Sequence, residues 1–335
     1  MTQPSRQPSQ VLVTGAAGFI GSRLVRHLLS TAPEDARIVA LTMPNSRRGH
    51  PAAGLRSISG DSRLITFGAD LTDALTLKSL GGESKDGPID TVFHLAAATP
   101  DSRASRETSR KVNLDGTKNL FNAVRESAKH FVYVSGLAIF KPGPESESTR
   151  VVNEDSPKDP SMEYIRIRLE AEEYLRENCV AAGIGFTAVY MPDVVYGNGG
   201  SFREIFLERI SRGSFRVPGS GRYYANFIHL DDAANILATI GSKRNVTAGQ
   251  SYIASDSEPA PFRDFVNCIA DELKVKRPGS APLFLAKAVV GSDLIGMLTK
   301  DTRASNEKIR KLVELKHSSF RTGIPQVVSE FKSGH

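Results

Sequence analysis

Short β-branched apolar runs alternate with longer stretches of helical spacing through the first two-thirds of the chain. The runs lie at 11–13, 37–41, 64–67, 91–95, 131–134 and 186–190. Each is followed by a loop and then by residues with helix-like spacing, as at 22–30. Strands that alternate with helices form parallel sheets. The pattern therefore predicts an α/β fold, a doubly wound parallel sheet with a ligand crevice at the carboxyl ends of its strands.

Beyond about Tyr190 this regularity ends. Glycine-rich turns occur at 197–200 and 218–221, and helical patterns occur at 261–273 and 303–315. We expect a flexible tail at 1–10, a sheet domain at 11–190, and a smaller C-terminal lobe at 191–330 that returns some chain to the sheet.

The composition excludes several classes of protein. The 335 residues are 40% hydrophobic and 24% charged, which is typical of a soluble globular protein. The net charge is +6, but the basic residues are scattered, so we expect no nucleic-acid partner. The spacing of Cys179 and Cys268 predicts no metal site.

A membrane segment is also not expected. The most apolar stretch, 281–298, is interrupted by Pro282, Lys287 and Asp293 and falls short of the ~20 residues that span a bilayer. The polar start of the chain does not have the apolar run of a signal peptide. We therefore expect a cytoplasmic protein without a membrane partner.

Gly15, Gly18 and Gly21 follow the first strand and open the first helix. This spacing allows a tight turn, a close approach of phosphate to the backbone, and close packing of helix on strand. We expect a dinucleotide pyrophosphate at the helix N-terminus, against Gly18, Phe19, Ile20 and Gly21. The alternative is a glycine-rich turn without a ligand.

The end of the second strand favours NADP(H) over NAD(H). Thr42 lies where a carboxylate would bind the ribose of NAD, and Glu34 and Asp35 precede that strand. Arg47 and Arg48 follow it and offer cations for a 2′-phosphate. Alternatively, the two arginines lie in a solvated loop.

A series of motifs along residues 10–330 carries a family resemblance. These are Thr14-Gly15-x-x-Gly18-x-x-Gly21, Asp70-Leu71, His94-Leu95-Ala96-Ala97, Asn113-x-x-Gly116-Thr117, Tyr164-x-x-x-Arg168, Pro192-x-x-Val195-Tyr196-Gly197 and His229-x-Asp231-Asp232. The chain resembles the extended short-chain dehydrogenase/reductases, in their NAD(P)-dependent epimerase/dehydratase branch. The resemblance implies a Rossmann-type domain that binds the dinucleotide and a C-terminal lobe that closes over the substrate.

The resemblance also implies cofactor contacts. Asp70 and Leu71 would flank the adenine, and Asn113 would support the active-site helix. Further contacts are implied in or after the later strands, at Leu95, Ala96, Ala97, Val134, Pro192 and Val195.

The motif that carries the chemistry departs from the family pattern. In the family Tyr-x-x-x-Lys, the tyrosine is the acid/base and the lysine lowers its pKa and holds the nicotinamide ribose. Tyr164 is present, but its i+4 partner on the same helix face is Arg168. Arginine keeps the positive charge but stays protonated, so it supplies electrostatic help without a proton relay.

The catalytic hydroxyl of the family falls on Gly136. Ser135 is adjacent, but neighbouring strand residues point to opposite faces, so Ser135 replaces it only if the strand has already turned. A strand-end hydrogen bond is the other role open to Ser135. Thr99, after the fourth strand, is a further candidate hydroxyl.

Three positions bear on the substrate. Gly136-Leu137-Ala138 replaces the Thr-Asp-Glu of the family's dehydratases, and Ala225 stands where nucleotide-sugar enzymes carry a diphosphate-binding arginine. Arg222 offers another route to a phosphate. We expect a smaller or more apolar carbonyl or hydroxyl compound.

Two further expectations concern structural roles. We expect His94 and the segment with His229, Asp231 and Asp232 to be structural, with the carboxylates capping helix N–H groups. A homodimer through the helices of Asn113 and Tyr164 is a guess from the resemblance. Its apolar candidates, which could equally pack on the sheet, are Leu120, Phe121, Val124, Leu169 and Leu175.

The preferred hypothesis is an NADP(H)-dependent oxidoreductase that interconverts a ketone and a secondary alcohol. Tyr164, Arg168 and Ser135 are the catalytic candidates. The first alternative is a sugar or nucleotide-sugar epimerase. The second is a nucleotide-binding regulatory protein that has lost the chemistry, because fold does not determine function.

Overall fold

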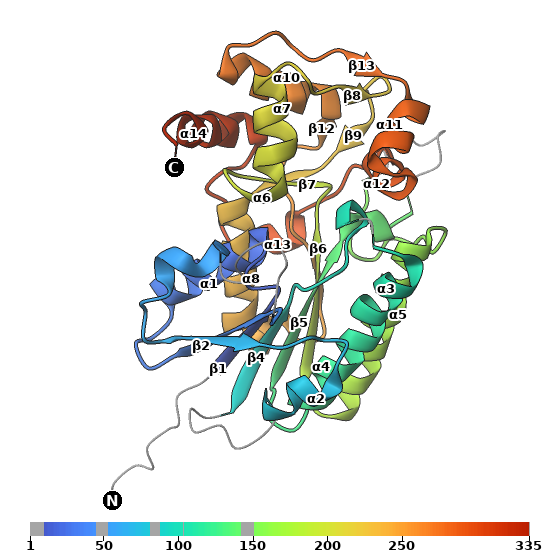
Figure 1. Cartoon of the computed structure of the whole chain (residues 1–335). Helices are drawn as coiled ribbons and strands as arrows, with labels where there is room; N and C mark the ends of the chain where they lie inside the picture. Colours follow the sequence, from blue (N-terminus) through green and yellow to red (C-terminus); the bar gives the residue numbers. More distant parts are fainter. Residues whose placement is uncertain (1–9, 45–52, 81–87, 103, 142–150, 335) are drawn as a thin grey trace, which may run out of the picture.

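The structure is a computed structural model that describes residues 10–44, 53–80, 88–102, 104–141 and 151–334. Its centre is a seven-stranded parallel sheet in the order β11-β6-β5-β4-β1-β2-β3 (Figure 1). The strands are β1 (Gln10–Thr14), β2 (Arg37–Thr42), β3 (Leu64–Gly68), β4 (Ile89–His94), β5 (His130–Gly136), β6 (Gly185–Met191) and β11 (Ser251–Ile253). The predicted doubly wound sheet is confirmed, with one strand more than the apolar runs indicate.

Helices cover both faces of this sheet. One face carries α2 (Ala74–Leu77), α4 (Gly116–Val124) and α5 (Glu163–Ala181), and the other carries α1 (Phe19–Thr31) and α8 (Leu230–Ser242). In β5, Phe131 and Tyr133 pack toward α4 and α5, whereas Val132 and Val134 pack toward α1 and α8. Burial on both faces explains why the strands are continuous apolar runs in the sequence.

The chain beyond β6 builds a second hydrophobic core around stacked phenylalanines. The rings of Phe227 and Phe265 stack with centroids 4.4 Å apart. The elements of this part are β7 (Val194–Tyr196), α6 (Gly200–Phe202), α7 (Arg209–Ser211), β8 (Val217–Pro218), β9 (Tyr224–Ala225), β10 (Phe227–His229), α9 (Arg244–Thr247), β12 (Ala260–Pro261), α10 (Phe262–Leu273), β13 (Ser280–Ala281), α11 (Leu283–Val290), α12 (Ser292–Leu298), α13 (Glu307–Arg310) and α14 (Phe320–Lys332). Most of them lie together on one side of the sheet (Figure 1).

The helix predicted at 303–315 is wrong in extent, because only the four residues of α13 are helical. The preceding backbone is used in other contacts. The N–H of Val152 donates to the carbonyl of Arg303 at 2.7 Å, and the N–H of Ala304 donates to Asn226 Oδ1 at 2.9 Å. Tertiary hydrogen bonds therefore override the helical spacing.

The structure also bears on the apolar stretch 281–298 and on the predicted N-terminal tail. The stretch 281–298 forms α11 and α12, which are separated at Gly291 with φ +115°. Within the described ranges, no helix is long and apolar enough to cross a bilayer. β1 begins at Gln10, and the rest of the predicted tail lies outside the described residues.

The apolar residues considered for a dimer contact are used inside the protein. Leu120, Phe121, Val124 and Leu175 are at most 2% exposed and belong to the core between the sheet and its helices, and Leu169 packs against that core. The four buried side chains are not available to a second copy, because α4 and α5 turn them toward the sheet. That contact surface is therefore wrong, and the alternative of packing on the sheet is correct.

Candidate functional site

A cleft of about 760 Å³ lies at the carboxyl ends of β1, β2, β3 and β4. Strand order reverses here between β1 and β4, which is where open α/β sheets bind ligands. The cleft brings together predicted cofactor residues from four loops, namely Gly15, Gly18, Thr42, Asp70, Leu71, Leu95, Ala96 and Ala97. The sequence analysis missed other lining residues, including Met43, Thr108, Lys111 and Val112. The last three share a helix face at i, i+3 and i+4 just before Asn113, a spacing that signals their position.

Two glycines of the first loop permit contacts that no side chain would allow. Gly15 has φ +65°, and a Cβ there would lie 2.9 Å from the backbone nitrogen of Ala96. A Cβ at Gly21 would lie 2.2 Å from the carbonyl oxygen of Gly15. The loop can therefore pack against the end of β4 and against its own helix only with glycine at these positions.

The start of α1 is suited to bind an anion. Its N-cap, Gly18, makes no side-chain cap, and its first turn contains no acidic residue. The first N–H groups of a helix lack intrahelical acceptors and carry partial positive charge. The side chains of Phe19 and Ile20 pack elsewhere, into the C-terminal core and the sheet core. These residues thus offer backbone N–H groups, and the site fits a dinucleotide pyrophosphate.

The described lining of the cleft contains one carboxylate, that of Asp70 at the end of β3. Asp70 Oδ1 accepts hydrogen bonds from Thr72 N at 2.8 Å and Thr72 Oγ1 at 2.9 Å, so it is used to fix its own loop. Thr42 lines the cleft and is 6% exposed. Arg47 and Arg48 lie outside the described residues.

A buried chain of hydrogen bonds, which sequence reasoning missed, runs beneath the cleft. Thr14 Oγ1 lies 2.8 Å from His94 Nδ1, and His94 Nε2 lies 2.8 Å from Thr117 Oγ1. Thr117 donates its own hydroxyl proton to the carbonyl of Asn113 at 2.8 Å. It therefore accepts from His94 Nε2–H, which leaves Nδ1 to accept from Thr14.

This chain also fixes the loop after β4. Thr14 Oγ1 accepts hydrogen bonds from the N–H groups of Leu95 and Ala96, each at 3.1 Å. Burial, with a smaller effect of the nearby Arg168 charge, lowers the pKa of His94 to about 3. The imidazole is therefore neutral, as the single-donor arrangement requires, and its predicted structural role fits these contacts.

Asn113 holds the same loop two residues further on, at Ala98. It lies in a π-helical turn, Lys111–Asp115, that follows α3 (Arg106–Arg110). Its Oδ1 accepts from Ala98 N at 2.8 Å, and its Nδ2 donates to Ala98 O at 3.0 Å and Ser109 Oγ at 3.1 Å. Asn113 thus positions the strand-end loop next to α3.

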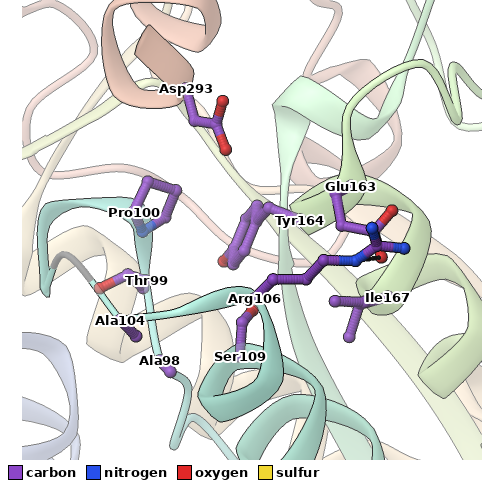
Figure 2. A pocket seen from close by; sticks show the side chains of 10 residues that line it. All are labelled: Ala98, Thr99, Pro100, Ala104, Arg106, Ser109, Glu163, Tyr164, Ile167 and Asp293. Atoms are coloured by element: carbon purple, nitrogen blue, oxygen red, sulfur yellow. Dashed lines mark hydrogen bonds and ion pairs between the residues drawn. The ribbon is translucent and has the colours of Figure 1, made fainter. Parts of the chain in front are cut away.

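Tyr164 lines a second, smaller cavity of about 140 Å³. Figure 2 shows its ring reaching from α5 toward the loop that carries Thr99. Asp293 of α12 lies above the ring in this view. Arg106 of α3 closes the lower rim and donates from Nε to Glu163 Oε1 at 2.7 Å. The C-terminal part of the chain thus completes the cavity around the predicted acid/base.

Arg168 lies one turn after Tyr164 and is 4% exposed. Its Nη2 donates to the carbonyl of Val134, and its guanidinium carbon lies 4.5 Å from the centre of the Tyr133 ring. Its Nη1 has no hydrogen-bond partner in the part of the chain that the structure describes. A buried cation with an unused donor indicates a missing acceptor at this point.

The backbone at the end of β5 shows whether the strand has turned at Ser135. Gly136 is still extended, with φ −121° and ψ 149°, so the strand has not turned at Ser135. Because side chains alternate, Ser135 shares the α5 face with Tyr133. Its Oγ is buried and has no partner among the described residues. A Cβ at Gly136 would meet nothing within 4 Å except its chain neighbours.

The structure does not bring the remaining predicted residues to either cavity. Pro192 is buried, and Val195 packs into the sheet core and pairs with Ile228. Arg222 is exposed in the turn before β9. None of the three lines the cleft or the Tyr164 cavity.

The histidine–aspartate segment takes part in packing contacts, but the capping detail differs from expectation. His229 Nδ1, and not a carboxylate, accepts from Asp231 N at the start of α8, at 3.1 Å. Asp231 forms an ion pair with Arg23 of α1. Asp232 accepts from the N–H groups of Lys316 and His317 at 2.7 and 2.9 Å. Its carboxylate thus binds a distant loop instead of its own helix.

Comparison with known proteins agrees with this architecture. The sequence pattern of the NAD dependent epimerase/dehydratase family matches residues 11–254. The chain is 28% identical over 276 residues to a 3-beta-hydroxysteroid dehydrogenase of Mycolicibacterium neoaurum, covering 76% of this chain and 68% of that protein. It is 29% identical over 300 residues to N-acetyl-alpha-D-glucosaminyl-diphospho-ditrans,octacis-undecaprenol 4-epimerase of Escherichia coli O157:H7, covering 87% and 80%.

Solved structures share the fold. UDP-glucose 4-epimerase of Thermotoga maritima, solved with UDP-glucose, superposes with a TM-score of 0.78 at 18% identity and covers 97% of this chain and 99% of that one. The human epimerase family protein SDR39U1, solved with NADPH, gives a TM-score of 0.74 at 19% identity, with coverages of 96% and 99%.

Proposed function

The chain belongs to the NAD-dependent epimerase/dehydratase family of extended short-chain dehydrogenase/reductases, and from this membership we propose that it interconverts a ketone and a secondary alcohol with NADP(H). Bound in the cleft, the nicotinamide supplies or accepts the hydride. Gly18 and the N–H groups of Phe19, Ile20 and Gly21 hold the pyrophosphate. Asp70, Leu71, Leu95, Ala96 and Ala97 line the cleft in which the rest of the nucleotide would lie.

One observation carries this proposal: Tyr164 lines a cavity one helical turn from a buried arginine with an unused donor. In the oxidation direction, Tyr164 Oη accepts the hydroxyl proton as the carbon loses hydride. The fixed charge of Arg168 stabilises negative charge on the phenol oxygen, and its Nη1 is available to a ribose hydroxyl. Reduction reverses the proton transfer.

Thr99 is the better placed hydroxyl for orienting the substrate carbonyl. Its side chain belongs to the wall of the Tyr164 cavity, whereas Ser135 Oγ is buried on the α5 face. Gly136 leaves open space at the end of β5.

The choice of NADP(H) rests on the end of β2. Thr42 and Met43 line the cleft there, and a carboxylate that would repel a 2′-phosphate is absent from the described lining at that strand end. Arg47 and Arg48 follow in the sequence and would supply the positive charge.

An apolar substrate is favoured over a nucleotide-sugar. Ala225 stands where the resemblance places the diphosphate-binding arginine of nucleotide-sugar enzymes, and it is 0% exposed. One relative is named for a steroid, and another for a sugar diphosphate attached to undecaprenol, whose polyprenol chain is apolar. A cytoplasmic location and a homodimer belong to the same proposal as expectations.

An epimerase is the second candidate, because relatives with that activity match over most of the chain. An epimerase returns the hydride to the same substrate, so its nucleotide does not need to leave. We would identify any co-purified nucleotide by mass spectrometry and time its exchange with added NADPH and NADH. Fast exchange that prefers NADPH supports the reductase, and a retained NAD supports the epimerase.

Substitution of Tyr164 tests the chemistry. In Tyr164→Phe we expect kcat to fall about 10²- to 10⁴-fold while nucleotide binding is unchanged, because only the proton donor is lost. Tyr174→Phe, further along the same helix, is the matched control. Turnover retained in Tyr164→Phe contradicts the assignment. Nucleotide binding without oxidation across a panel of carbonyl and hydroxyl compounds supports the binding-only alternative.

A further inference from the structure

Helix α11 exposes apolar side chains to solvent. Leu283, Phe284 and Leu285 are 41%, 70% and 48% exposed, and the one buried residue of this helix is Ala286. Folding therefore buries little of the apolar surface of α11. The helix lies at the outer edge of the C-terminal part, next to α12 (Figure 1).

The surroundings of this helix are basic. Lys287 on α11 is exposed, and the turn before β9, which carries exposed Arg222, approaches Leu283 at Gly219. Arg263 joins the two segments, donating to Ser220 O at 2.7 Å and Ser280 Oγ at 2.6 Å. The sequence has no Asp or Glu at 214–226 or 279–291. We call Leu283, Phe284, Leu285, Lys287 and Arg222 the α11 surface.

The α11 surface is linked to the catalytic cavity. α12 follows α11 after Gly291, and the two helices pack together. Asp293, in the first turn of α12, lines the cavity of Tyr164 (Figure 2). Only the start of α12 thus separates the α11 surface, along the chain, from the wall of the Tyr164 cavity.

We propose that the α11 surface docks on an anionic lipid membrane, from which an apolar substrate enters. Exposed leucine and phenylalanine beside basic residues, with Asp293 of α12 as the next acidic residue along the chain, is the composition of an interfacial helix. The positive charge complements anionic headgroups. It disfavours a second copy of this chain, because a two-fold contact would bring together two copies of the same positively charged surface. This contact departs from the expectation that no membrane is a partner.

Flotation of the full chain with lipid vesicles tests the proposal. We expect binding to phosphatidylcholine vesicles that contain phosphatidylserine, weaker binding without phosphatidylserine, and release at high salt. Phe284→Glu should reduce the bound fraction about tenfold or more. Lys287→Gln should reduce it about fivefold. The readout requires no turnover, so it is independent of the proposed function.

Val180→Glu is the matched control, because Val180 is 74% exposed on α5, away from the α11 surface, and should leave binding unchanged. Thermal unfolding verifies that each variant folds. Absence of vesicle binding, equal binding with and without phosphatidylserine, or an equal loss in Val180→Glu overturns the proposal. A concentration-dependent dimer that Phe284→Glu dissociates assigns the surface to a second copy and also overturns it.

Discussion

The cleft at the ends of β1 to β4 and the corner at the end of β5, formed by Ser135, Gly136 and Arg168, differ in how far the protein satisfies its own polar groups. Beneath the cleft, the side chains of Thr14, His94 and Thr117 form one connected chain of hydrogen bonds. In the corner, Ser135 Oγ and Arg168 Nη1 are buried without a partner in the described structure. Buried polar atoms normally find partners, so the protein itself preorganises the cleft, whereas two buried polar atoms of the corner have none in the described structure.

Glycines show the same contrast. A Cβ at Gly21 would lie 2.2 Å from a backbone oxygen, whereas a Cβ at Gly136 would meet nothing within 4 Å apart from its chain neighbours. Gly21 is required by close packing, and Gly136 leaves space. Perturbations of the cleft should therefore be costly, and changes in the corner should alter rate more than stability.

Acid should have the largest effect, through the buried histidines. Burial lowers the pKa of His94 to about 3 and that of His130 to about 4, both below the ordinary 6.5. Between the lowered pKa of each histidine and 6.5, the unfolded chain binds more protons than the folded protein. The stabilisation from each neutral histidine is therefore fully present above pH 6.5 and is lost as the pH falls. Each histidine should contribute about 1.4 kcal/mol per pH unit.

Chemical denaturation between pH 7 and pH 4.5 measures this slope. His94→Asn and His130→Asn should each reduce it by about one proton. His130, which bonds to Thr187 Oγ1 at 2.8 Å and does not line the cleft, is the matched control. Only His94→Asn should also weaken nucleotide binding, about tenfold, because Thr14 loses a partner. Equal nucleotide affinity in the two variants contradicts the role given to the chain of hydrogen bonds.

Gly21→Ala should break the cleft more selectively. The added methyl group displaces the backbone of Gly15, at a cost of about 1–3 kcal/mol in stability and about 100-fold in nucleotide affinity. Calorimetric titration with NADPH and thermal unfolding measure the two effects. Gly60→Ala is the control, because a Cβ at Gly60 meets no atom within 4 Å. Tight NADPH binding by Gly21→Ala would falsify the assignment of this loop.

Arg168→Met tests the unused donor in the corner. Loss of a charge-assisted hydrogen bond should lower kcat/KM about 30- to 100-fold, with the larger share in the nucleotide KM if Nη1 holds the ribose. Arg168→Lys should restore most activity and add a pH dependence, because lysine titrates where arginine does not.

The control for Arg168 is Arg176→Met on the same helix. Its guanidinium carbon also lies near an aromatic ring, 5.0 Å from the centre of Phe186, and its Nη2 bonds to Glu172 Oε1 at 3.2 Å. Arg176→Met should leave the nucleotide KM unchanged. A similar rise in KM for both variants would show that Arg168 acts only through the stability of α5.

The sheet could be predicted from the sequence because its strands are buried on both faces and so appear as apolar runs. β11 escaped prediction since its three residues are too few for a periodic signal. The hydrogen bond of Thr14 to His94 depends on the register that places these residues opposite each other on β1 and β4, and the sequence does not contain that register.

Glycine spacing predicts the cleft because Gly15 and Gly21 are each required by a close contact with nearby backbone. The corner depends on which hydroxyl reaches the cavity, a question of side-chain direction and burial. Sequence reasoning therefore placed Ser135 ahead of Thr99, whereas in the structure the side chain of Thr99 lines the cavity of Tyr164. The apolar spacing of Leu120 and Phe121 likewise suits a dimer contact and a core equally, and the structure assigns both to the core.

Gly136→Ser should give the smallest effect, and in the opposite direction. Gly136 has extended φ and ψ, and the space beside it is open, so serine fits without strain. Its hydroxyl would lie where the family resemblance places the catalytic one, and kcat/KM should rise a few-fold, about the value of one neutral hydrogen bond.

Thr99→Val should lower kcat/KM about tenfold in the wild-type background and less in Gly136→Ser, because the new hydroxyl shares the task. Ser135→Ala should change little. If Ser135→Ala is instead the damaging substitution and Gly136→Ser has no effect, the corner already contains its hydroxyl, and the contrast with the cleft would lie in the arginine alone.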